Sequence, residues 1–391
     1  MAVFVERFVG KLLTRSRTSP LQFALKFPPK LLPSVNNPIL KMWNLVISRA
    51  EHWDRVNFCI TPDTQPLLSA LKGRLDVLQH LVIDATRIDT NKIEALDAFA
   101  YFPRLTSFRS VRYPLYHLNL PWDQLREVDI TDAGVHPIHI LRRTPLVETA
   151  EFTGGQHSIA TAAQTSVLLP HLHTLLLVPS NDPLPYLTLP ALKNTLLPSK
   201  NTATCFRNLS SLILRSACAL ESFSIAEIGN DLITVERLIE ALHRMPSLTR
   251  LRITSQMEGC SALYNVLALR ATDPSSFAIL PQLQHLHVHV GRRSAITPSF
   301  VTFIEARENR EGEISPDSKS STLRQIDMLS FGSHIGRTSR ALRRRLRDIV
   351  ERGRIKVLLP DEMRNSWLNK GSGYLEGNRN TLGFDLLDIG D

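Results

Sequence analysis

Cysteine is scarce in this chain of 391 residues: the 4 cysteines are scattered, without the paired spacing of a disulfide framework or a zinc cluster. Long apolar runs are also lacking, and none approaches the roughly 20 residues that a membrane-spanning helix needs. We therefore expect a protein of a reducing intracellular compartment, cytoplasmic or nuclear, with no membrane partner. The net charge of +9 is modest for this length and by itself indicates no particular partner.

Signatures of catalytic sites are lacking as well. Gly154 and Gly155 are followed by Gln156 and His157, not by the Lys-Ser or Lys-Thr of a phosphate-binding loop. The chain has no Gly-x-Ser-x-Gly elbow, and no cysteine stands in a recognisable nucleophile motif. We predict a protein that is not an enzyme and that needs no cofactor.

What the chain has instead is a recurring apolar pattern: one apolar residue, a second three places later and a third two places after that. Leu283, Leu286 and Val288 form one copy. The same spacing recurs at Leu78/Leu81/Ile83, Leu125/Val128/Ile130, Leu172/Leu175/Leu177, Leu209/Leu212/Leu214, Leu248/Leu251/Ile253 and Leu323/Ile326/Met328. A poorer copy begins at Leu105, and those at Leu146 and Leu192 are degenerate.

This pattern is typical of short strands at regular intervals. The last two apolar residues are two apart, which places them on one face of a strand. A proline precedes many copies, as at Pro103, Pro170 and Pro281, and marks the start of a strand because it donates no ladder hydrogen bond. Copies spaced about twenty to forty residues apart predict an α/β, leucine-rich-repeat-like solenoid with irregular repeats, a curved parallel sheet with helices and loops on its outer face. Leucine-rich helices that share the spacing by chance are the alternative.

We expect three regions. Residues 1–60 form an N-terminal cap region of helices and short strands, 61–359 form the solenoid with a flexible polar insertion near 308–321, and 360–391 form a poorly ordered tail. Helices are predicted over Ala2–Leu13, Ile39–Trp53, Thr64–Leu71, Thr234–Met245, Ser261–Ala271, Ser299–Arg307 and Thr338–Arg352. Strands outside the repeated pattern are predicted over Pro20–Phe27, Arg55–Ile60 and Ile355–Leu359. The first helix also has the composition of a mitochondrial presequence, but Glu6 argues against import.

Residues between the apolar positions are predicted to project onto the inner, concave face of the sheet, the surface with which such folds hold partners. The exposed positions of this concave face include His80, Asp84, Gln325 and Asp327. This face is then acidic near its middle and cationic toward its C-terminal third. The candidate partner-binding residues are Glu127, Asp129, Arg250, Arg252, His285, His287 and His289.

Two of these groups have alternative interpretations. Three histidines at alternate positions of a strand can share a zinc ion, but no acidic residue lies near them in sequence, so we interpret them as an exposed polar face and predict no metal. Basic residues crowd the helix over 338–354, which suggests nucleic-acid binding. They surround an apolar stripe as a solvated face does, and no aromatic residue for base stacking accompanies them: Arg340, Arg343, Arg344, Arg345 and Arg347.

Three segments, Arg15–Leu25 (RSRTSPLQFAL), Ser48–Val56 (SRAEHWDRV) and Leu120–Leu125 (LPWDQL), occur in an order that resembles the divergent F-box and leucine-rich-repeat-like proteins of mushroom-forming fungi. The resemblance covers residues 11–358. It implies the substrate-recognition part of a cullin-RING ubiquitin ligase, with the ubiquitin chemistry performed by other subunits.

In that family an F-box normally precedes the first of these segments, and this chain shows none there. The resemblance therefore implies a Skp-type adaptor as partner only if an F-box is supplied upstream. The function expected is non-catalytic protein binding, with the partner itself unidentified. A free-standing interaction protein without a ubiquitin link, or a nucleic-acid-binding protein using the 338–354 helix, are the alternatives.

Overall fold

The fold is that of a computed structural model, which describes residues 2–16, 18–26, 38–61, 64–85, 95–132, 134–154, 166–178, 183–197, 203–225, 232–255, 260–272, 276–290, 296–308, 323–330, 339–352 and 356–358. Two expected regions lie outside this description: the tail at 360–391 and residues 309–321 of the insertion. The side chain of Met328, the last apolar residue of the final copy of the repeated pattern, is also outside it. The division of the chain at residue 60 stays a prediction.

One sheet of 13 strands runs through the described part of the chain, and its strands follow one another in chain order. Every neighbouring pair is parallel. The prediction of an α/β chain with a long parallel sheet is confirmed. The strands are β1 (Leu21–Lys26), β2 (Trp53–Cys59), β3 (His80–Asp84), β4 (Ser107–Val111), β5 (Glu127–Thr131), β6 (Thr149–Thr153), β8 (Thr174–Leu177), β10 (Asn194–Leu197), β11 (Ser222–Ile225), β12 (Arg250–Ser255), β13 (His285–Val290), β14 (Gln325–Ser330) and β15 (Lys356–Leu358).

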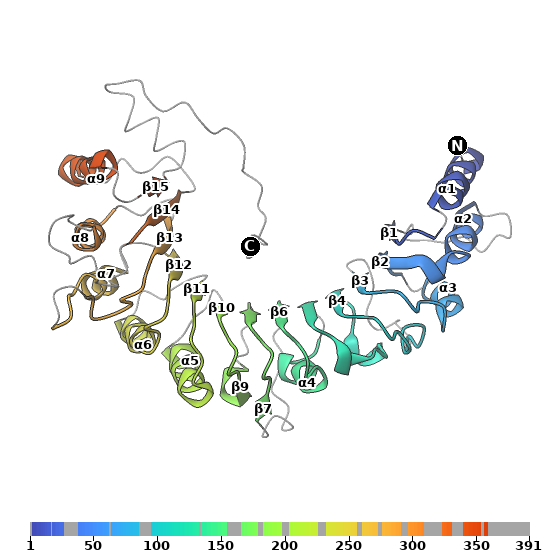
Figure 1. The fold of residues 1–391 in the computed structure, drawn as a ribbon, viewed down its shortest axis with the longest axis horizontal. Helices are drawn as coiled ribbons and strands as arrows, with labels where there is room; N and C mark the ends of the chain where they lie inside the picture. The colour runs from blue at the N-terminus through green and yellow to red at the C-terminus, as the bar shows by residue number, and fades with distance from the viewer. Residues whose placement is uncertain are drawn as a thin grey trace.

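The sheet bends into an open arc, with the strands along its inner side and the helices along its outer side (Figure 1). Two short strands, β7 (Val167–Leu168) and β9 (Leu187–Thr188), pair separately outside the main sheet. Connections near the middle of the arc are short and contain 3-10 turns or, between β5 and β6, a short helix, whereas those toward the C-terminus are longer and contain helices. The helices are α1 (Ala2–Ser16), α2 (Pro38–Ile47), α3 (Gln65–Leu68), α4 (Pro137–Arg143), α5 (Ala203–Ser216), α6 (Leu232–His243), α7 (Ser261–Leu267), α8 (Pro298–Arg307) and α9 (Arg340–Arg352).

The core lies between the sheet and the outer elements, and the repeated apolar residues fill it. Leu283, Leu286 and Val288 are at most 1% exposed, as the pattern predicts. Beneath the first strands the core is aromatic: the Trp53 ring packs edge-on against Phe23 with 4.9 Å between ring centroids. Each Leu, Ile or Val buried in this way contributes about 1.5–3 kcal/mol relative to exposure.

The strand predicted at Leu209/Leu212/Leu214 is wrong, because these residues belong to α5. Leu209 and Leu212 are buried and Leu214 is 62% exposed, as expected of one helical face rather than of alternating strand residues. Apolar residues three apart lie on one face of a helix, so this spacing fits a helix as well as the start of a strand. No proline immediately precedes this copy to mark a strand start.

The strand of that unit is β11, in which Phe223 and Ile225 are buried. The copy beginning at Leu192, which the sequence suggested was degenerate, forms an ordinary strand, β10, with buried Thr195 in the place of the second apolar residue. The helix predicted over Ile39–Trp53 is too long. It ends at Ile47, because Trp53 already begins β2, where its ring enters the core.

Three neighbouring strands end in the same left-handed turn. Arg112, Asp132 and Gly154 follow β4, β5 and β6, and all three have positive φ angles, of 57°, 50° and 73°. The backbone N–H of Arg112 donates to the Thr131 carbonyl, and that of Asp132 to the Thr153 carbonyl. At Gly154 the turn also requires glycine for space, since a Cβ would lie 1.8 Å from Asp132 Oδ1.

Arginines at the C-terminal ends of helices bind the preceding part of the chain. Arg215, at the end of α5, donates to the carbonyl oxygens of Leu184 and Leu187, each at 2.9 Å. Arg307, at the end of α8, is 1% exposed and donates to three carbonyl oxygens, those of Leu267, Ile279 and Leu280.

The Arg307 guanidinium also lies 3.8 Å from the centroid of the Phe277 ring. Burial, with a smaller effect of nearby Arg270, lowers the pKa of Arg307 to about 9, so it remains positively charged at neutral pH. The three carbonyl oxygens and the ring face replace the water that this cation loses on folding.

Candidate protein-binding face

Parallel pairing aligns the residues between the apolar positions into two rows that cross the sheet. Their neighbours in each strand are buried against the helices, so these rows line the inner face of the arc. The first row contains Arg55, His80, Ser107, Glu127, Thr149, Thr174, Asn194, Ser222, Arg250, His285 and Gln325. The second contains Asn57, Val82, Arg109, Asp129, Glu151, Leu176, Leu196, Ser224, Arg252 and His287.

The acidic part of this face centres on Asp129 and Glu151, which are register neighbours on β5 and β6. Arg109 Nε, on β4, lies 3.1 Å from Asp129 Oδ2. Burial raises the pKa of the Asp129 carboxyl, and Arg109 partly offsets this. Burial raises the pKa of Glu151 too, with a further contribution from the Asp129 charge and an opposing one from Arg109. We call Glu127, Asp129 and Glu151 the acidic pole.

The sequence did not single out Arg109 and Glu151. The copy beginning at Leu105 has no third apolar residue, and Arg109 therefore looked like part of an irregular stretch. The pattern could still have assigned it to the inner face, because the residue after the second apolar position faces inward in every regular copy. Glu151 was missed because the copy was placed one residue too early: Leu146 is 42% exposed, and the buried residues are Val147, Ala150 and Phe152. In the corrected register Glu151 follows the second apolar position and faces inward.

An apolar strip adjoins the acidic pole. Leu176 on β8 and Leu196 on β10 are register partners, and both are half-buried on the inner face. Beside them Asn194 Nδ2 donates to Thr174 Oγ1 at 3.2 Å. The next strand, β11, presents only the small hydroxyl side chains of Ser222 and Ser224.

Beyond the serines lies the basic pole, formed by Arg250 and Arg252 on β12. Both are exposed, and their register partners on β13 are His285 and His287, which are half-buried. His289 aligns with Thr254 in the backbone pairing, but its side chain lies outside the described residues. Guanidinium groups two residues apart on one strand can hold a carboxylate through paired hydrogen bonds.

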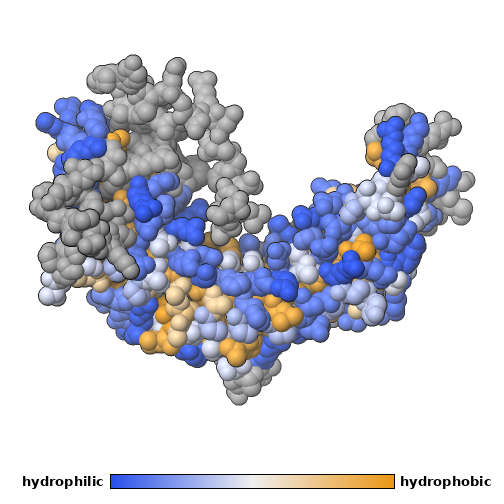
Figure 2. All heavy atoms as spheres, viewed as in Figure 1, coloured by the Kyte–Doolittle hydropathy of each residue, from blue (hydrophilic) through white to orange (hydrophobic). Residues whose placement is uncertain are grey.

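The predicted residues other than His289 thus share one face but form two separate groups. Four strands, β6, β8, β10 and β11, lie between β5 and β12. At about 4.8 Å per strand, Asp129 and Arg252 are about 24 Å apart along the sheet. The space-filling view shows mostly hydrophilic residues along the inner edge of the arc, whereas the apolar residues near the middle lie on the side turned to the viewer, toward the outer edge (Figure 2).

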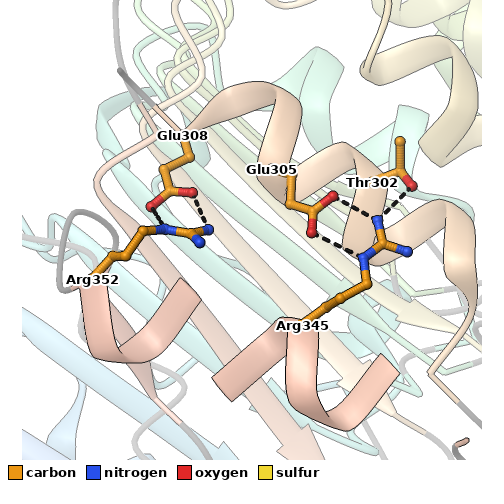
Figure 3. A network of polar contacts seen from close by, with 5 residues as sticks. All are labelled: Thr302, Glu305, Glu308, Arg345 and Arg352. Atoms are coloured by element: carbon orange, nitrogen blue, oxygen red, sulfur yellow. Dashed lines mark hydrogen bonds and ion pairs between the residues drawn. The ribbon is translucent and has the colours of Figure 1, made fainter. Parts of the chain in front are cut away.

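Two arginines of α9 form ion pairs with carboxylates while their side chains stay 40% and 43% exposed (Figure 3). Arg345 donates to both carboxylate oxygens of Glu305, at 3.0 and 2.6 Å, and Arg352 Nε donates to Glu308 Oε1 at 2.7 Å. Arg345 therefore keeps its contact with solvent, as expected of a solvated face, and adds an ion pair that the sequence did not predict. These pairs fasten α9 to α8 and reduce the positive charge that α9 offers to a phosphate backbone.

Among the described residues, no group of three or more His, Cys, Asp and Glu side chains is arranged to hold a metal ion. Nor does any helix in the described ranges have the length and apolar character needed to cross a membrane. Comparison with known protein families and with curated proteins finds no match to this chain.

Proposed function

We propose that this chain is a non-catalytic, leucine-rich-repeat-like solenoid that binds a protein partner on its inner face. The observation that carries the proposal is the pair of aligned rows: side chains from strand after strand line one continuous curved surface, while their neighbours are buried on the other side. An extended concave surface of this kind suits recognition of another chain rather than enclosure of a small molecule.

The resemblance to fungal F-box proteins extends the proposal. If an F-box is supplied from upstream, the chain serves as the substrate-recognition part of a cullin-RING ubiquitin ligase. The segments that carry the resemblance have structural roles: Trp53 is fully buried, and Trp122 is 3% exposed beneath the Arg143 guanidinium. Such segments preserve the scaffold, so partner choice rests with the side chains of the inner face.

The test is affinity purification of the tagged full chain from cells that express it, with quantitative mass spectrometry. Proteins held by the inner face are expected to be lost from the Arg250→Glu/Arg252→Glu variant and retained by Arg207→Glu/Arg244→Glu. The control makes the same charge change at exposed positions of α5 and the turn after α6. An identical set of proteins on all three chains would count against the proposal.

The ubiquitin link is tested separately, with a purified Skp-type adaptor. Direct binding of the adaptor to the chain extended by its upstream coding sequence is expected. If that extended chain neither binds the adaptor nor co-purifies with a cullin, the protein is a free-standing binder. Nucleic-acid binding receives less support than the helix sequence suggested, because Arg345 and Arg352 are already paired with carboxylates.

A further inference from the structure

Resting on the proposed function, we infer the chemistry of the partner: the inner face recognises a bipolar protein segment. A lysine or arginine of this segment lies against the acidic pole, apolar side chains lie on Leu176 and Leu196, and an aspartate or glutamate lies against Arg250 and Arg252. The occupant is identified by charge complementarity with two poles of opposite sign on one continuous surface.

The acidic pole has an unmet demand for positive charge. It contains three carboxylates, Glu127, Asp129 and Glu151, and among their register neighbours on β4 to β8 the described cation is Arg109. Arg109 Nε lies against Asp129 on β5, and Glu151 is on the next strand, β6. An incoming ammonium or guanidinium group would stabilise the Glu151 carboxylate, whose ionised form burial now disfavours.

The basic pole has the opposite demand. Arg250 and Arg252 are exposed, and the register neighbours on both sides supply no described carboxylate: β11 offers Ser222 and Ser224, and β13 offers His285 and His287. A guanidinium group can bind a carboxylate through two parallel N–H···O hydrogen bonds, so each of these arginines suits an acidic side chain.

The distance between the poles sets the length of the segment. From Glu151 on β6 to Arg252 on β12 there are four strand spacings, about 19 Å. An extended chain covers this distance in about six residues. The half-buried Leu176 and Leu196 lie inside the interval, next to the acidic pole, so the apolar residues of the segment follow its basic residue directly.

The same layout argues against other occupants. A nucleic acid would bring phosphates to the acidic pole, and a uniformly basic peptide would bring cations to Arg250 and Arg252. Like charges placed together cost free energy, so one pole rejects each of these ligands while the other attracts it.

The inference is tested with a displayed library of random twelve-residue peptides selected on the native full chain. Enriched peptides are expected to carry Lys or Arg and Asp or Glu about six residues apart, with apolar residues between them. On the Arg250→Glu/Arg252→Glu chain, selection is expected to shift to peptides that are basic at both ends. On Asp129→Lys/Glu151→Lys it is expected to shift to peptides that are acidic at both ends.

A representative synthetic peptide then quantifies the effect by fluorescence anisotropy. Its affinity should fall about tenfold on Arg250→Glu/Arg252→Glu, return when its acidic residue is replaced by lysine, and stay unchanged on Arg207→Glu/Arg244→Glu. Thermal melting verifies that each variant is folded. If a charge reversal unfolds the chain, the single variants Glu151→Gln at the acidic pole and Arg252→Gln at the basic pole replace the reversals.

Selected peptides of a single sign, the same charge pattern on native and reversed chains, or no enrichment at all would overturn the inference. If cellular proteins still depend on Arg250 and Arg252 while the peptides show no bipolar pattern, this inference fails and the proposed function stands. If no protein depends on the inner face, both fail.

Discussion

Consecutive residues of one strand have opposite roles in this molecule. On β13 the Leu286 side chain is buried beneath the sheet, whereas His285 and His287 on either side of it are half-buried on the inner face. The pleat of the strand produces this alternation, and thus one residue of register separates stability from recognition.

Substitutions at adjacent register positions should separate these two roles. Leu286→Ala is expected to lower the free energy of unfolding by about 2–5 kcal/mol, because it leaves a cavity in a packed core. Arg250→Ala, at an exposed position in register with His285, is expected to change it by about 0.5 kcal/mol or less. Chemical denaturation followed by circular dichroism measures both, and a reversed order would mean that the facing of the strands is misassigned.

Glu151 should make stability depend on pH. Burial raises the pKa of its carboxyl in the folded chain above that in the unfolded chain. As pH rises, the unfolded chain therefore loses this proton first, so the free energy of unfolding falls until the pH exceeds the folded-state pKa. The native chain thus bears a cost at neutral pH that is absent in acid.

Glu151→Gln removes this cost. The variant is expected to be more stable than the native chain at neutral pH, and the difference should shrink as pH falls through the raised pKa of Glu151. Urea denaturation at a series of pH values measures it. Glu236→Gln, on the exposed side of α6, is the matched control for the loss of one carboxylate, and a Glu151→Gln difference no larger than this control at every pH would contradict the prediction.

At this scale the sequence was informative wherever the apolar spacing was regular. The facing of Asp129 and Arg252 followed from the buried residues beside them. Arg109 and Glu151 were missed because the copies around them are irregular, and the pairing of charges across strands depends on register, which no single repeat contains.

At the scale of elements, helix-end arginines join successive units. Arg143 lies 4.8 Å above the Trp122 ring, Arg215 and Arg307 donate to backbone carbonyls of the preceding segment, and Arg352 pairs with Glu308. A cation in the last turn also interacts favourably with the helix dipole. A guanidinium suits this position because its donors fan out in a plane and satisfy several acceptors together.

The two ion pairs between α8 and α9 should differ in strength. The Glu308 side chain is 7% exposed and that of Glu305 is 34% exposed. Arg352→Gln leaves a nearly buried carboxylate without its partner and should cost about 1.5–3 kcal/mol. Arg345→Gln exposes its carboxylate to solvent and should cost about 1 kcal/mol or less.

Thermal unfolding of the two single variants measures this difference. Glu308→Gln combined with Arg352→Gln is the control, because it removes the stranded charge and should recover part of the loss. Equal costs for the two single variants would show that burial of Glu308 does not determine the strength of its pair.

Helices and strands could be predicted from the sequence where a second signal accompanied the leucines. Ser339, whose Oγ accepts from the Leu342 N–H, marks the start of α9, and Pro246 separates α6 from β12. The leucines at 209 and 212 had no such companion, so the spacing alone suggested a strand where the chain is helical.

At the scale of the whole molecule, contacts are made between successive units. Each strand of the sheet pairs with the strands before and after it, and α8 packs against α7 and α9. Long-range order along the arc is therefore transmitted from neighbour to neighbour.

This arrangement predicts that damage stays local. Leu81→Ala in β3 should speed amide hydrogen exchange in β2 to β4 and leave β12 to β14 unaltered, and Leu286→Ala should give the reverse pattern. Exchange followed by mass spectrometry of peptide fragments measures both. Uniform acceleration along the chain would show that the arc unfolds as a single cooperative unit.

The chain order of the sheet also decides how the molecule responds to force. The terminal strands β1 and β15 lie at opposite edges of the sheet, so tension applied between them acts perpendicular to the strands. The hydrogen bonds between one pair of neighbouring strands at a time carry this force. A force parallel to the strands would instead load all the hydrogen bonds of a strand pair together. Stretched in an optical trap, the protein should lengthen in many small steps at low force, and each step should release one strand with the helix or turn behind it.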